Sequence, residues 1–380
     1  MKIAIVHSFY SSDQPSGENV VVQAQFHALS NAGHQVELVS KHTDEEQHQS
    51  GYKIRAALSA ANIYGPSPTQ ELRTFSPDII HIHNLFPNWG SDWMKEWSDR
   101  IVTTLHNYRP ICAKGTLWRE GHDCYECIDQ SAYRAISHKC YRDSAIATLP
   151  LAYASRERGH HSPILLNSRQ LIVLNDDAFR TYNSIGLPLK LSVVPNFANE
   201  AHVESKEIED YWLYVGRLSA EKGILRLIQN WPINENLHIV GAGPSSNAVT
   251  DSISPFPQTF TYLGQLPSDD VRSRIKHAKG LIIPSLWREG IPTVALEALQ
   301  LGTPILVSDL CSSATSLTEG GGGSTFDPYD SRTLKNALHK VKANRAEMSS
   351  MAKHVYDRRY SEKAWLRSIE NIYHDVITGR

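Results

Sequence analysis

The sequence predicts an α/β protein of two doubly wound, Rossmann-like domains, and three observations support this. The chain has 380 residues, which is more than one hydrophobic core usually supports. Short apolar runs that end in polar residues alternate with helix-like segments, a pattern typical of parallel sheets. This alternation begins again after the stretch "VVPNFAN". Two successive strand–helix series of this kind imply two doubly wound domains.

The first series occupies residues 1–195. It opens as strand, helix and strand: "KIAIVHSFY", then "VVVQAQFHALSNAG" with Gly33 as the helix stop, then the alternating "HQVELVS". Further buried strands are predicted at "PDIIHIHN", "RIVTTLHN" and "LIVLN". We place the domain boundary near residues 195–200, because a Pro-Asn turn there leads into an acidic stretch with few apolar residues.

The second series occupies residues 196–360. Its strands are predicted at "YWLYVGRL", "LHIVGAGP", "FTYLGQL", "KGLIIPS" and "TPILVSD". The run of four glycines at residues 320–323 is expected to form a flexible turn. Residues 361–380 form an amphipathic helical pattern that suits either half, and we expect this helix to pack back on the N-terminal domain.

The amino-acid composition limits the partners that the protein is expected to bind and the cellular compartment in which it is expected. With 38 Lys and Arg against 40 Asp and Glu, the chain has no overall positive charge, which disfavours nucleic-acid binding. The N-terminus shows no secretory signal, and no apolar run approaches the roughly 18 to 20 residues that span a membrane. We therefore expect a cytoplasmic protein whose membrane contact is at most peripheral, at the inner face of the cell membrane.

Two acids flank an otherwise apolar run in "SLWREGIPTVALEALQLG". The pattern predicts a loop with Glu289, then a helix from Pro292 to near Gly302 with Glu297 about five residues in, roughly 7.5 Å along the axis. This separation excludes a single acid–base dyad and suggests two tasks at a helix N-terminus that offers free N–H groups. The alternative is a solvated helix-entry acid and an exposed acid on the helix face.

A second candidate site lies in "YVGRLSAEKGI". Arg217 and Lys222 stand at the two ends of one loop after a strand, and a guanidinium and an ammonium so placed suit a diphosphate. The sequence has no Asp-x-Asp motif, so these cations rather than a chelated metal are expected to offset its charge. The alternative is a pair of surface charges beside Glu221. Gly17, after the first strand, is a weaker candidate phosphate contact.

These stretches resemble the retaining glycosyltransferases of family 4. "EGIPTVALEA" looks like the family's E-x7-E signature, and "VGRLSAEKG" looks like its diphosphate loop. "HIHN", "TTLHNYRP", "VVPN", "VGAGP" and "YLGQLPSDDV" follow in the family's order, so the likeness covers nearly the whole chain. The resemblance implies the GT-B fold: an acceptor-binding domain (residues 1–195) and a nucleotide-sugar donor-binding domain (residues 196–360) that face each other across a cleft.

The resemblance also implies roles for individual residues. Glu289 would lie beside the donor sugar and stabilise the oxocarbenium-like transition state, and Glu297 would hold the ribose of the nucleotide. Arg217 and Lys222 would bind the diphosphate and offset the charge on the leaving group. His106 would contact the donor sugar from the N-terminal domain. Backbone contacts to the sugar hydroxyls would come from four consecutive residues: Gly290, Ile291, Pro292 and Thr293.

The expected activity is therefore retaining transfer of a hexosyl unit to an acceptor hydroxyl in cell-surface polysaccharide or glycolipid biosynthesis. The donor would be a UDP- or GDP-sugar, the acceptor a glycan or glycolipid, and no cofactor would be required. Three alternatives stay open: a non-catalytic nucleotide-sugar-binding scaffold of a polysaccharide assembly complex, a GT-B nucleotide-sugar epimerase, and a sugar phosphorylase. His81 and His83, at the end of another predicted strand, are expected to be structural.

Residues 107–161 form an insertion that is the part least typical of the family. It holds four of the five cysteines, namely Cys112, Cys124, Cys127 and Cys140. Four thiolates would suffice for a structural zinc ion, while the alternative is reduced thiols packed as small apolar groups. Disulfides are least expected in a reducing compartment. Basic and aromatic residues here, including Arg119 and Arg142, suggest that the insertion recognises the acceptor.

Overall fold

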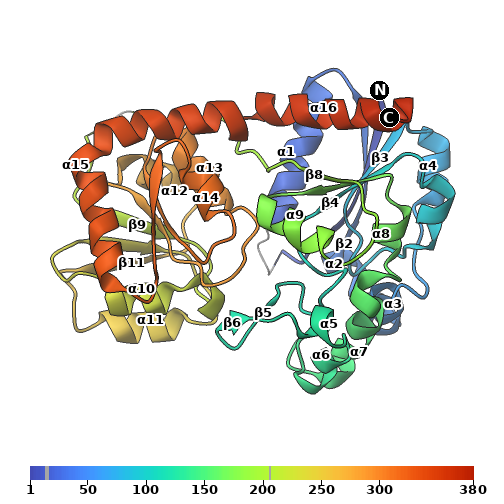
Figure 1. The fold of residues 1–380 in the computed structure, drawn as a ribbon, viewed down its shortest axis with the longest axis horizontal. Coiled ribbons are helices and arrows are strands. Elements are labelled where there is room, and N and C mark those ends of the chain that lie inside the picture. Colours follow the sequence, from blue (N-terminus) through green and yellow to red (C-terminus); the bar gives the residue numbers. More distant parts are fainter. Residues whose placement is uncertain (13–16, 205–206) are drawn as a thin grey trace. The chain divides into compact units, whose positions relative to one another are not determined.

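The computed structural model describes residues 1–12, 17–204 and 207–380. These residues form two compact units, shown in Figure 1. The N unit comprises residues 1–119, 124–194 and 366–380, and the C unit comprises residues 120–123 and 195–365. Residues 13–16, in the predicted loop before Gly17, and residues 205–206, just after the predicted boundary, lie outside the described part.

The N unit is built on a six-stranded sheet with the order β2-β1-β3-β4-β7-β8. Its neighbouring strands pair in parallel in the described residues. Its strands β3 and β4 are buried along their whole length, including the polar residues that they contain. The strands are β1 (Lys2–Phe9), β2 (Gln35–His42), β3 (Ile79–Asn84), β4 (Ile101–Leu105), β7 (Gln170–Val173) and β8 (Leu191–Val193).

Helices connect these strands. They are α1 (Gly17–Asn31), α2 (Thr43–Glu46), α3 (Tyr52–Ala60), α4 (Thr69–Phe75), the 3-10 helix η1 (Asp92–Trp97), α8 (Pro163–Asn167) and α9 (Asp176–Asn183). The C-terminal helix α16 (Glu362–Thr378) also contributes most of its length to this unit. It is fastened there by Tyr373, whose hydroxyl lies 2.7 Å from Nδ1 of the buried His81. A second contact is made by Glu370 of the same helix, whose carboxylate lies 3.0 Å from Nε2 of His34.

The insertion consists of short elements. They are the hairpin strands β5 (Trp118–Arg119) and β6 (His122–Asp123), α5 (Glu126–Asp129), α6 (Arg134–Ser137), α7 (Ala145–Ala154) and the 3-10 helix η2 (Glu157–Gly159). A small cluster of buried side chains, including Cys127, Ala135 and Leu151, holds them together. Other apolar side chains of the insertion, Ile111, Leu117 and Ile128, belong to a larger hydrophobic cluster with Leu171 and Val173 of β7.

The C unit is built on a second six-stranded sheet, with the order β11-β10-β9-β12-β13-β14, whose neighbouring strands pair in parallel in the described residues. Its strands are β9 (Trp212–Val215), β10 (Leu237–Val240), β11 (Phe260–Gly264), β12 (Leu281–Ile283), β13 (Ile305–Ser308) and β14 (Gly323–Phe326). The run of glycines at residues 320–323 was predicted to be a flexible turn. This prediction is wrong for the last residue of the run, because Gly323 begins β14.

Helices complete the C unit. They are η3 (Ala220–Lys222), α10 (Ile224–Asn230), α11 (Ser246–Ile253), α12 (Ser268–His277), α13 (Thr293–Gln300), α14 (Ala314–Thr318), α15 (Ser331–Val355) and the π-helical turn η4 (Tyr356–Tyr360). Trp212 is fully buried at the centre of the core, and α15 packs Leu334, Leu338 and Val341 into the same cluster. The predicted fold class is confirmed: both units are parallel-sheet, Rossmann-like α/β domains. Nowhere in the described chain is a helix both long and apolar enough to cross a bilayer.

Candidate active site

Lys222 and Glu289 meet in the C unit, beyond the carboxyl ends of the neighbouring strands β9 and β12. A glycine makes this meeting possible. Gly223 has a φ of +73°, and a Cβ atom there would lie only 1.9 Å from the carbonyl oxygen of Pro284. Only glycine lets the two loops approach so closely. The residue before it, Lys222, is thereby brought against the loop that carries Glu289.

The carboxylate of Glu289 is held from two sides. It is only 8% exposed; one oxygen forms an ion pair with Nζ of Lys222, and the other accepts a hydrogen bond from the Ser285 hydroxyl at 2.6 Å. The hydroxyl of Ser312 donates to the backbone carbonyl of Glu289. Neither serine was predicted from the sequence as a site residue. The one available signal was the position of Ser285 at the end of the predicted strand "KGLIIPS".

Helix α13 follows this loop. It begins at Thr293, one residue later than predicted, and Pro292 is the N-cap. Glu297 lies on the helix, and burial raises the pKa of its carboxyl, an effect that the nearby Arg272 partly opposes. The structure therefore pairs Glu289 with a cation, whereas Glu297 is half-buried on the helix.

Arg217 lies on the loop after β9 and is exposed. Its carbonyl oxygen accepts a hydrogen bond from the hydroxyl of Tyr214 at 2.9 Å, so the backbone at this position is fixed by a buried side chain. The loop after β10 lies directly against it, since a Cβ on Gly241 would approach the carbonyl oxygen of Gly216 to 1.9 Å. The glycines of "VGRL" and "VGAGP" thus allow two backbones to touch beside Arg217.

His106 lies in the N unit, directly after β4. Its Nε2 is 2.9 Å from Nδ1 of His83, and the two rings stack with their centroids 5.2 Å apart. Burial lowers the pKa of His106 to about 3, so the ring is neutral at ordinary pH. His81 lies between the Thr104 hydroxyl, at 2.8 Å, and Tyr373 of α16. Both nitrogens of His81 are therefore occupied by structural contacts.

Gly17, the weakest of the predicted donor contacts, is the first residue of α1 and is exposed. It belongs to the N unit, as does His106. The remaining predicted donor contacts, Gly290 and Ile291, directly precede the N-cap of α13 in the C unit. The structure thus gathers the C-terminal candidates around β9, β12 and α13.

The predicted zinc site is not supported. Across residues 1–12, 17–204 and 207–380, no group of three or more His, Cys, Asp or Glu side chains could hold a metal ion. All four cysteines are free thiols. A hydrogen bond from Cys127 lowers the pKa of Cys112 to about 6, and both side chains are buried. Cys127 and Cys140 pack with apolar side chains of the insertion core, as small apolar groups do.

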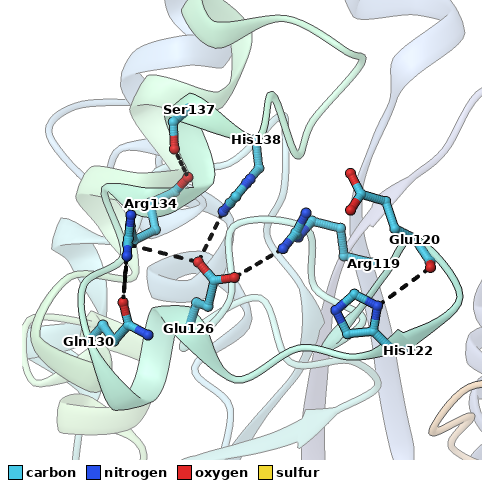
Figure 2. A network of polar contacts seen from close by, with 8 residues as sticks. All are labelled: Arg119, Glu120, His122, Glu126, Gln130, Arg134, Ser137 and His138. Atoms are coloured by element: carbon cyan, nitrogen blue, oxygen red, sulfur yellow. Dashed lines mark hydrogen bonds and ion pairs between the residues drawn. The ribbon is translucent and has the colours of Figure 1, made fainter.

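A polar network organises the insertion around Glu126 (Figure 2). One carboxylate oxygen accepts a hydrogen bond from Arg119 at 3.0 Å, and the other lies 2.9 Å from Nε2 of His138. The contact with His138 lowers the pKa of Glu126. Arg134 adds a longer contact of 3.9 Å. Arg119 is thus engaged in structure, whereas Arg142 is exposed and stacks over the ring of Tyr141 at 5.4 Å.

Comparison with known protein families matches both halves of the chain. A family described as "Glycosyl transferases group 1" matches residues 197–358, and "Glycosyltransferase Family 4" matches residues 15–201. An uncharacterised glycosyltransferase of Methanocaldococcus jannaschii is 34% identical, covering 82% of this chain and 81% of its own. A putative teichuronic acid biosynthesis glycosyltransferase of Bacillus subtilis is 24% identical, covering 100% and 98%.

Solved structures share the fold. Sucrose-phosphate synthase from Thermosynechococcus elongatus superimposes with a TM-score of 0.69 at 17% identity, covering 100% of both chains. Anabaena HepE in complex with UDP-glucose superimposes with a TM-score of 0.62 at 13% identity, covering 99% of this chain and 100% of its own. At such identities the likeness concerns the fold alone.

Proposed function

Because this chain belongs to family 4 of the GT-B glycosyltransferases, we propose that it moves a hexosyl unit from a nucleoside-diphosphate sugar to an acceptor hydroxyl, with retention of anomeric configuration. The observation that carries this proposal is the pairing of Lys222 with the buried Glu289, which the close approach of Gly223 to Pro284 enforces. With an acid and a cation fixed side by side, the acid can stabilise positive charge on the sugar while the cation stabilises negative charge on the phosphate leaving group.

Lys222 and Arg217 bind the diphosphate and offset the negative charge that grows on it as the glycosidic bond to phosphate breaks. The ammonium group of Lys222 is a compact charge that its ion pair with Glu289 holds in place. The planar guanidinium of Arg217 can donate two parallel hydrogen bonds, and the hydroxyl of Tyr214 fixes the backbone of Arg217. The N-terminus of α13 also favours the negatively charged diphosphate, because the backbone N–H groups of its first turn are free and the helix dipole is positive there. Together these groups stabilise the leaving group more in the transition state than in the ground state.

Glu289 lies beside the donor sugar and stabilises the positive charge that develops at the anomeric carbon. Its two oxygens are oriented by Lys222 and Ser285, so no reorganisation is needed at the moment of reaction. Glu297 binds the ribose hydroxyls, and the backbone from Gly290 to Thr293 contacts the sugar hydroxyls. His106, which is neutral, contacts the donor sugar from the N unit as a hydrogen-bonding group rather than as a cation.

The names of relatives support a role in surface glycan synthesis. Those similar to this chain include the teichuronic acid enzyme and an O-antigen chain mannosyltransferase of Salmonella typhimurium, which is 27% identical over 44% of this chain and 48% of its own. We infer a glycan or glycolipid acceptor on the cytoplasmic side of the membrane. Neither relative fixes the sugar that this chain transfers.

A screen of nucleotides tests the proposed function. We expect UDP or GDP, and the matching nucleotide sugar, to raise the melting temperature selectively, because a ligand that binds only the folded state stabilises it by about 2.7 kcal/mol at 100 times its Kd. ADP and the nucleoside monophosphates serve as comparisons in the same thermal-shift assay. If no nucleoside diphosphate or its sugar shifted the melting temperature, the proposed function would be wrong.

A membrane contact is proposed for helix α7. Its residues Ile146, Leu149 and Tyr153 are 86%, 52% and 38% exposed and lie on one face of the helix. Such an apolar stripe beside the exposed Lys139 and Arg142 suits a bilayer containing anionic lipid.

Flotation with vesicles tests this contact. We expect binding to vesicles with phosphatidylglycerol and weaker binding to pure phosphatidylcholine, and at least a roughly tenfold loss for the double variant Ile146→Ser, Leu149→Ser, since each buried side chain contributes about 1.5 to 3 kcal/mol. Ile233→Ser, at a residue 69% exposed in the C unit, is the matched control. Equal binding by the double variant and the control variant would refute the contact.

A further inference from the structure

A polar cavity with a volume of about 70 Å³ lies in the N unit, at the carboxyl ends of β3 and β4. Ser59 of α3, His83 of β3 and Arg109, in the loop after β4, are among the residues that line it. Each of the three has a buried side-chain atom without a hydrogen-bond partner in the described chain: Oγ of Ser59, Nε2 of His83 and Nε of Arg109. Ser59 and His83 are each only 5% exposed. Since buried polar atoms are nearly always paired, we expect this cavity to hold a polar occupant.

Arg109 gives the cavity a positive charge that no acid balances. Among the described residues, no Asp or Glu lines the cavity, and Arg109 forms no ion pair. Its guanidinium instead lies 4.2 Å from the ring centroid of Phe86, and one terminal nitrogen donates to the carbonyl oxygen of Ala113 at 3.4 Å. Glu18 of α1 supplies no counter-charge either, because burial raises the pKa of its carboxyl to about 8 and leaves it uncharged at neutral pH. A buried donor on an unbalanced cation favours an anion over a water molecule as the occupant.

The volume of the cavity limits the occupant to a small ion. One water molecule takes up about 30 Å³ in the liquid, so the cavity has room for about two. A monatomic anion fits this space, whereas a sugar ring or a nucleotide does not. All three unpaired atoms can donate a hydrogen bond: the hydroxyl of Ser59, Nε of Arg109, and Nε2 of His83 in one of its two neutral forms. We propose that this cavity binds a small monovalent anion such as chloride.

His83 connects the anion site to His106. Its Nε2 is the unpaired atom at the cavity, and its Nδ1 lies 2.9 Å from Nε2 of His106. Burial lowers the pKa of His106 to about 3 and that of His83 well below its usual value, so both rings are neutral at ordinary pH. A neutral imidazole carries one proton, so only one of the two rings can donate the hydrogen bond between them. The pair therefore has two forms, which differ in which ring is the donor.

The anion selects one of these forms, which makes His83 a positioning residue for His106. An anion only accepts hydrogen bonds, so the proton of His83 must be on Nε2. Nδ1 of His83 is then an acceptor, and His106 donates to it from Nε2. His106 is left with an unprotonated Nδ1, which can accept a hydrogen bond from a hydroxyl of the donor sugar. This last contact rests on the proposed function, whereas the anion site does not.

Nitrogen NMR of the full-length protein with isotopically labelled histidine tests the proposal near neutral pH. Sodium chloride is compared with sodium gluconate at equal ionic strength, because gluconate is too large for the cavity. We expect chloride, but not gluconate, to shift the signals of His83 and His106 saturably toward the pattern of a proton on Nε2 of both rings. The two sets of signals are assigned by their loss in His83→Asn and His106→Asn. Chloride binding that left the protons of His106 unchanged would refute the link between the anion and His106.

Two variants locate the anion. Arg109→Gln removes the positive charge and should weaken chloride binding at least about tenfold, because a charge-assisted hydrogen bond is lost. Ser59→Ala removes one neutral donor with little change in volume and should weaken binding by about two- to tenfold. Arg180→Gln, at an exposed arginine of α9 in the same unit, is the matched control and should respond like the unchanged protein. Equal responses to chloride and gluconate, or a chloride response that both cavity variants retain in full, would overturn the proposal.

Bromide provides a second measurement that needs no variant. We expect crystals of the unchanged protein grown with sodium bromide to show an anomalous peak in the cavity beside Arg109 and His83. Crystals with no such peak would overturn the anion site. Neither measurement uses a nucleotide, so the failure of the anion site and the failure of the nucleotide screen are separate results.

Discussion

Replacing Glu289 by glutamine is expected to lower kcat by roughly 10²- to 10³-fold, the size of effect seen when one preorganised electrostatic group is removed. Glutamine keeps the shape of the side chain and can still meet Ser285, but it cannot stabilise positive charge at the anomeric carbon. Nucleotide affinity should change by no more than about threefold, because Lys222 remains to bind the diphosphate. The measurement is steady-state transfer from the nucleotide sugar that the thermal-shift screen identifies.

Glu347→Gln, at an exposed residue of α15, is the matched control and should keep full activity. A loss of kcat together with an equal loss of nucleotide affinity would contradict the separate roles given to Glu289 and Lys222. Unchanged turnover in Glu289→Gln would remove Glu289 from the catalytic site altogether.

Replacing Lys222 by methionine is expected to weaken nucleoside-diphosphate binding by at least about tenfold, because a charge-assisted contact to phosphate is lost. The folded state should also lose stability, since Glu289 would be left as a buried acid without its cation. The double variant Lys222→Met, Glu289→Gln should recover much of that stability while remaining weak in nucleotide binding. Thermal unfolding of the single and double variants separates the two effects.

Much of the C-unit site follows from the sequence because its geometry is local. The apolar run "KGLIIPS", the proline before α13 and Gly302 after its end predict the bounds of the helix that carries Glu297 to within two residues. The loop glycines were predicted to let a ligand approach the backbone, whereas Gly223 and Gly241 let two backbones approach: an added Cβ would lie 1.9 Å from a carbonyl oxygen at each. The partner of each glycine, however, depends on which strands are neighbours, and local patterns do not specify that order.

The parts that sequence reasoning missed depend on contacts between distant segments. Strand β14 was hidden by its glycine-rich sequence, yet it pairs along its length with β13. The contact between the buried His81 and Tyr373 joins residues 292 positions apart, and neither local sequence predicts it. The four clustered cysteines suggested a metal because their spacing is compatible with one, but spacing alone does not set the direction of the thiols.

The central claim is that Lys222, held by Glu289, receives the diphosphate of the donor without a divalent cation. Its most direct test is calorimetric titration of the preferred nucleoside diphosphate in the presence of EDTA, using the unchanged protein, Lys222→Met and the control Lys335→Met at an exposed lysine of α15. We predict that the unchanged protein and the control bind with the same Kd and that Lys222→Met binds at least about tenfold more weakly. Equal affinity in all three proteins, or binding that appears only when a divalent cation is restored, would contradict the claim.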